Sequence, residues 1–95
     1  MHLEIITPET KVFAGEVEAV QLPGIEGLFQ VLTNHAPIIS ALTTGTIKVD
    51  LTQAFEEDEK TSPLIQKGSN SKVIQVAING GVVEMLNNKI IVLAE

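Results

Sequence analysis

The sequence predicts an all-β domain, a flattened β-sandwich of about nine or ten short strands. Three observations support this prediction. Apolar and polar residues alternate at a period of two, the apolar residues are almost all Val, Ile, Leu and Ala, and turn-forming residues separate the apolar runs. No helix of ordinary length fits the pattern. A single domain over residues 1–95 is expected, since domains commonly hold roughly 100 residues.

The expected strands follow one another along the chain with short connections. In order, they cover residues 3–6, 12–13, 16–22, 28–32, 38–42, 46–51, 73–78, 82–86 and 89–94. The segment 46–51 alternates cleanly, with Ile47, Val49 and Leu51 on one face. In contrast, 73–78 and 89–94 are apolar on both faces, which is typical of central strands.

Glycine and asparagine mark the connections between these strands. The pair Asn87-Asn88 tolerates positive φ and fits a two-residue hairpin turn, and Gly45 fits a tight turn before the strand at 46–51. The pair Gly80-Gly81 indicates a bulge or a close crossing of two backbones.

The segment from Thr52 to Lys72 breaks this pattern, because it is long, polar and rich in turn formers. A structureless loop of about 20 residues is uncommon inside a compact domain. A mobile and dispensable surface insertion is the preferred interpretation, although Asp50 or Thr52 could cap a short helix with Ala54 and Phe55 facing inward. Its acidic cluster lacks the alternating spacing and central glycine of a calcium loop.

Composition excludes several classes of partner. The net charge is −6 and there is no cluster of Lys or Arg, which argues against nucleic acid and against anionic membrane surfaces. Three Phe with no Tyr or Trp supply few stacking platforms for bases or sugars. Without cysteine, a secretory signal or an apolar run of roughly 20 residues, the sequence predicts a soluble protein with no lipid insertion. A protein partner or a small ligand remains.

No catalytic, cofactor-binding or metal-binding set is expected. A hydrolase could be imagined around His35 with Ser40 or Thr33, but no motif positions a nucleophile. Zinc would need three or four ligands, and neither histidine has a second ligand at a suitable spacing. The glycines do not precede a helix or a Lys-Ser/Thr pair, so they do not form a phosphate loop.

The most distinctive segment is residues 22–37, which read Leu-Pro-Gly-Ile-Glu-Gly-Leu-Phe-Gln-Val-Leu-Thr-Asn-His-Ala-Pro. It resembles the signature loop of the epsilon subunits of F-type ATP synthases, which have a Gly-x-Glu-Gly turn, a short strand and a His-Ala-Pro sequence. The segments 6–17, 78–84 and 90–94 resemble other parts of the same family. The resemblance covers residues 1–51 and 73–95 in order, as the N-terminal β-sandwich domain without the C-terminal helical hairpin.

This resemblance implies a non-catalytic subunit of the central stalk, which joins the gamma subunit to the membrane c-ring on the cytoplasmic face of the bacterial inner membrane. It implies a rotor-ring contact at Glu26, Gly27, Leu28 and His35, and a gamma contact on one sheet face, for which the candidates are Val12, Phe13, Ile39 and Leu42. His35 is also expected to satisfy loop backbone groups with its ring. Leu28 stands where the family often has an acidic residue, so Glu26 is the expected source of any charged contact.

Two other functions stay open from the sequence. The first is a free-standing β-sandwich that binds a small ligand or a peptide on an edge strand, and it predicts a sizeable apolar cavity with convergent polar groups. The second is a minor hydrolase of unknown substrate. The stalk interpretation instead predicts a complex with gamma and no deep pocket.

Overall fold

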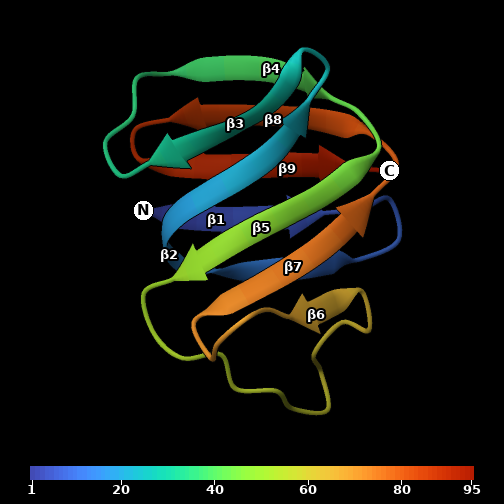
Figure 1. Cartoon of the computed structure of the whole chain (residues 1–95). Helices are drawn as coiled ribbons and strands as arrows, with labels where there is room; N and C mark the ends of the chain where they lie inside the picture. The colour runs from blue at the N-terminus through green and yellow to red at the C-terminus, as the bar shows by residue number, and fades with distance from the viewer.

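The computed structural model describes all 95 residues, as nine strands with no helix (Figure 1). The prediction of an all-β fold of about nine strands is therefore confirmed. The strands are β1 (His2–Ile6), β2 (Lys11–Gly24), β3 (Gly27–Leu32), β4 (Ile38–Leu42), β5 (Gly45–Leu51), β6 (Ile65–Lys67), β7 (Val73–Ile78), β8 (Gly81–Leu86) and β9 (Lys89–Ala94).

One strand, β2, belongs to both layers of the fold. Its first part, Lys11–Glu16, pairs with β1, and its second part pairs with β5 and β3. The back layer in Figure 1 therefore runs β4-β8-β9-β1-β2, and the front layer runs β3-β2-β5-β7-β6. Only β1 and β9 pair in parallel. The sequence predicted two strands here with a break near Gly15, but β2 is continuous through this glycine. A side chain at Gly15 would meet the ring of Phe13.

The core lies between the two layers and contains no buried polar side chain. Its centre consists of side chains with essentially no exposed surface, including Leu3, Ile5, Leu22, Ile47, Ile74 and Ile90. Phe13, Phe29 and Phe55 are half-buried and pack against this centre. Burial of apolar surface at about 25 cal/mol per Å² stabilises the fold, and the chain has no cysteine that could form a disulfide.

The turns confirm two of the three sequence interpretations. Asn87 and Asn88 have φ of 52° and 61°, which is the geometry of a two-residue hairpin turn between β8 and β9. Gly81 has a φ of 147°, and a Cβ there would collide with the carbonyl oxygen of Leu93, so two backbones do approach closely at this glycine. The turn interpretation does not explain Gly45, because the φ of this residue is not positive. Glycine fits there because a side chain would collide with Pro23.

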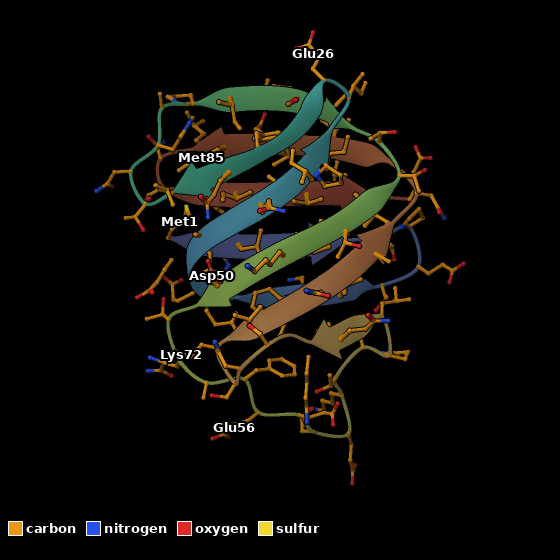
Figure 2. The ribbon with its side chains drawn as sticks, viewed as in Figure 1. Met1, Glu26, Asp50, Glu56, Lys72 and Met85 are labelled. Carbon is orange, nitrogen blue, oxygen red and sulfur yellow. The ribbon has the colours of Figure 1, made fainter.

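The segment between β5 and β7 is partly built into the sheet. It contains no helix, so the expected alternative of a short helix is wrong. Its strand β6 pairs with β7, the amide of Phe55 donates to the carbonyl of Ser71 (2.7 Å), and Phe55 and Ile65 pack against the core. The acidic side chains stay in solvent, as Glu56 shows in Figure 2.

Candidate interaction surfaces

The outer face of the back layer is unusually apolar for a solvent-exposed sheet. Ala41, Val82, Leu93 and Ile6 are direct cross-strand neighbours over β4, β8, β9 and β1. The next row contains Ile39, which is 75% exposed, and Ile91, on either side of Glu84. We use the name apolar face for the apolar residues of these two rows and Leu86, that is, Ile6, Ile39, Ala41, Val82, Leu86, Ile91 and Leu93. Exposed apolar residues gathered on one face are typical of interaction sites, so this face is a candidate.

The outer face of the front layer is polar along its middle, and its exposed apolar residues Leu28 and Leu32 lie at the β3 border. A row of five polar side chains crosses all five strands, where Gln30, Gln21, Lys48, Gln75 and Gln66 are direct neighbours on β3, β2, β5, β7 and β6. We call this set the polar row. Because amide and ammonium groups lose hydration when they are covered, the front face is the poorer candidate for a tight protein contact.

Two of the four residues expected to contact gamma are buried in the core. Val12 and Leu42 are only 4% and 5% exposed and belong to the core, so their apolar character is used inside the sandwich. Phe13 is half-buried, and only Ile39 lies fully on the surface. Val82, Ile91, Leu86 and Leu93 were missed, although residues 89–94 are apolar on both faces. In a two-layer sandwich only one of those faces can be covered by the core.

The residues expected to contact the rotor ring lie in two places. Glu26, Gly27 and Leu28 lie at or beside the β2–β3 turn, and His35 lies elsewhere. Ile25 and Glu26 form the two-residue turn between β2 and β3, and Figure 2 shows Glu26 pointing outward at the edge of the molecule. Ile25 and Leu28 are each 67% exposed. A shallow hollow of about 520 Å³ lies between this turn and Ser40-Ala41 of β4. The turn therefore presents two apolar side chains and one carboxylate without an ion-pair partner.

His35 lies at the opposite end of β3 from Glu26, so the structure does not bring these residues together. Six residues of strand separate them, which corresponds to roughly 17–20 Å. The Nδ1 atom of His35 is 2.7 Å from the carbonyl oxygen of Ala36, and its backbone amide donates to Leu32. This agrees with the structural interpretation of His35. Asn34 has a φ of 64°, and its amide donates to the side chain of Asn88 in the β8–β9 turn.

A charged cluster borders the apolar face where β1 meets β2 and β9. Nδ1 of His2 lies 3.0 Å from Glu16, and Nε2 lies 3.2 Å from Glu4. Lys11 and Lys89 approach Glu4 at 3.8 and 3.6 Å. Hydrogen bonding to the His2 ring and the nearby positive charges hold the pKa of both glutamates below the ordinary value of 4.5, against the opposing effect of desolvation.

Acid should therefore weaken the contribution of this cluster to stability. Because the folded-state pKa of each glutamate lies below its unfolded value, the contribution is complete above pH 4.5 and is lost as the pH falls through the folded value. We expect Glu4→Gln with Glu16→Gln to lower the urea midpoint at pH 7 and to lower it by less at pH 3. A difference that stays the same at both pH values would contradict the assignment.

The remaining features of the surface are its titratable groups and its hollows. No group of three or more His, Asp and Glu side chains is arranged to hold a metal ion. The hollows are open and shallow, and none encloses converging polar groups. The structure also contains no helix with the length and hydropathy required to cross a membrane.

Residues 1–68 match the family model described as ATP synthase, Delta/Epsilon chain, beta-sandwich domain. The epsilon chain of the Desulforamulus reducens ATP synthase is 37% identical over 94 residues, covering 99% of this chain and 58% of that relative. The epsilon chain of Chlorobium limicola is 34% identical over 93 residues, covering 98% of this chain and 86% of the relative. This chain thus spans little more than half of the first relative and most of the second.

Two solved structures share the fold. One contains the central stalk and c-ring of the Tetrahymena thermophila mitochondrial ATP synthase, with a TM-score of 0.68 and 16% identity, over 99% of this chain and 62% of the matched chain. The other contains the F1 part and c-ring of the Euglena gracilis enzyme, with a TM-score of 0.70 and 17% identity, over 97% and 48%. At this level of identity, the matches establish the architecture alone.

Proposed function

Because the chain belongs to the family of the ATP synthase delta and epsilon chains, through their β-sandwich domain, we propose that it is a central-stalk subunit of a rotary, proton-translocating ATP synthase. In this role it joins the gamma subunit to the c-ring. It is a non-catalytic, peripheral component on the cytoplasmic face of the bacterial inner membrane.

The observation that supports a gamma contact most strongly is the difference between the two outer faces. A stalk subunit must stay bound while it turns with its neighbours, and burial of apolar surface supplies most of the free energy in lasting protein contacts. The apolar face offers such a surface, including the predicted residue Ile39 and four others that are exposed, whereas the polar row does not. We therefore place gamma on the outer face of β4, β8 and β9.

The ring contact belongs at the β2–β3 turn in this proposal. Ile25, Glu26 and Leu28 project from the end of the sandwich, where a flat apolar-and-charged tip can rest on the polar loops of a ring. His35 lies at the other end of β3, so we assign it the structural role of holding the loop before β4. The two contacts then use different parts of the domain, as a bridge between two partners requires.

The proposal predicts that a charge on the apolar face disrupts the gamma complex. Leu93→Glu places a carboxylate where apolar surface would be buried, so the affinity for purified gamma should fall at least about 30-fold, which corresponds to roughly 2 kcal/mol. Isothermal titration calorimetry measures this change directly. Leu93 is 55% exposed, so the free protein should fold normally.

The matched control is Gln75→Glu on the polar row, which adds the same charge to the opposite face. It should change the affinity less than about threefold, as expected of a residue outside the interface. If Gln75→Glu weakens binding as strongly as Leu93→Glu, gamma does not bind the apolar face.

A further inference from the structure

The strand β3 forms a border of the front layer and has a free edge. It pairs with β2 on one side and with no strand on the other (Figure 1). The hollow beside Leu28 and Phe29 separates this edge from β4. An unpaired edge presents a row of backbone N–H and C=O groups that can pair with another extended chain.

The residues that present these groups follow from the register with β2. Pro23 has no N–H and its carbonyl accepts from Thr43, so its pair with Leu28 is not hydrogen-bonded. Hydrogen-bonded and non-hydrogen-bonded pairs alternate in an antiparallel ladder. Phe29 and Val31 therefore bond to β2, while the backbone groups of Leu28 and Gln30 and the amide of Leu32 face the free edge. The carbonyl of Leu32 already accepts from the amide of His35.

This edge lacks the usual protection against pairing. Natural edge strands are commonly blocked by charges, proline, bulges or short length. The other border of the front layer has such protection, because β6 is only three residues long and ends in Lys67. In contrast, β3 has six residues, with no charge, no proline and a regular register with β2.

The sequence of β3 is also complementary to itself. If two copies pair antiparallel with Gln30 opposite Gln30 on a two-fold axis, Leu28 of each copy lies opposite Leu32 of the other. All three side chains are exposed on the same outer face, so this register pairs leucine with leucine and amide with amide. The two Glu26 side chains lie at opposite ends of the pair and do not repel each other.

We propose that β3 is a homotypic docking edge through which two copies of this chain pair into one continuous antiparallel sheet. The interface is isologous and small, so the dissociation constant should be on the order of 100 μM. The proposal rests on strand geometry alone and does not depend on the role in the central stalk.

Sedimentation velocity of the 95-residue chain from about 10 μM to 1 mM tests the proposal. The wild type should change from monomer to dimer over this range. Gln30→Pro removes an N–H that β2 does not use, and Gln30→Lys places like charges directly opposite each other. Each should weaken dimerisation at least about tenfold. Gln66→Lys, at the protected border, should leave dimerisation unchanged.

Amide hydrogen exchange at the two ends of this concentration range supplies the second measurement. The amides of Leu28, Gln30 and Leu32 should become slower to exchange as the concentration rises, while those of Phe29 and Val31 should be protected throughout. A chain that stays monomeric at about 1 mM overturns the proposal. So does a dimer that Gln66→Lys dissociates and Gln30→Lys does not.

Discussion

Replacing Gly81 with alanine should destabilise the fold by about 3 kcal/mol or more, the largest loss that we expect from one methyl group. Gly81 has a φ of 147°, which residues with a side chain rarely adopt. A Cβ there would also collide with the backbone of Leu93 and Ala94 on β9. Because Gly81 opens β8 and pairs with both Leu42 and Ala94, the strain cannot be relieved without breaking the back layer.

Gly27→Ala is the control that separates the two causes. Gly27 also has a positive φ, 128°, but nothing lies within 4 Å of a Cβ placed there. Only the backbone strain should destabilise this variant, by about 1 kcal/mol. Urea unfolding of both variants measures the difference. Equal losses would mean that the close approach of Gly81 to β9 contributes nothing.

Replacing residues 53–71 with an Asn-Gly turn should destabilise the protein by about 2 kcal/mol. Loss of the packed Phe55 and Ile65 side chains costs about 4 kcal/mol, because both lie against the core. Shortening the loop returns roughly 0.6 kcal/mol for each halving of its length, or about 2 kcal/mol in all. The sequence alone predicted a dispensable excursion, whose shortening would stabilise slightly.

Two variants of the full-length chain show which part of the segment matters. Phe55→Ala should account for about 2 kcal/mol of the loss. Exchanging the exposed acidic residues 56–59 for serine should change the free energy of unfolding by less than about 0.5 kcal/mol. A shortened chain with the urea midpoint of the wild type would show that the segment is not part of the core.

The sequence predicted the strands and turns well, because those features depend on local patterns. A period of two places the strands except β6, which has only three residues and was missed, and β2, which was predicted as two strands. The Asn87-Asn88 pair has few conformations other than a hairpin turn. The layer to which a strand belongs is not local information. The passage of β2 from one layer to the other depends on its partners, β1 at one end and β5 with β3 at the other.

The candidate surfaces were predicted less well for the same reason. Val12 and Leu42 look the same in sequence as exposed apolar residues, and only the closed core shows that they are inside. His35 and Glu26 are close in sequence, but an extended strand lies between them. The best unused signal was the apolar character of both faces of residues 89–94, since one face of a sandwich strand must point outward.

In the role that we propose, this chain bridges gamma and the c-ring through two different surfaces. Because the chain contains no cysteine, a single cysteine can report each surface. Ile39→Cys marks the apolar face, Leu28→Cys marks the β2–β3 turn, and Gln75→Cys marks the polar row. Each variant, carrying a photoreactive maleimide, would be incorporated into the assembled ATP synthase and cross-linked by light.

We expect Ile39→Cys to cross-link to gamma, Leu28→Cys to cross-link to the c subunit, and Gln75→Cys to cross-link to neither. Mass spectrometry of the cross-linked bands identifies each partner. Cross-linking of Gln75→Cys to gamma, with Ile39→Cys and Leu28→Cys left free, would show that neither surface is the contact proposed for it.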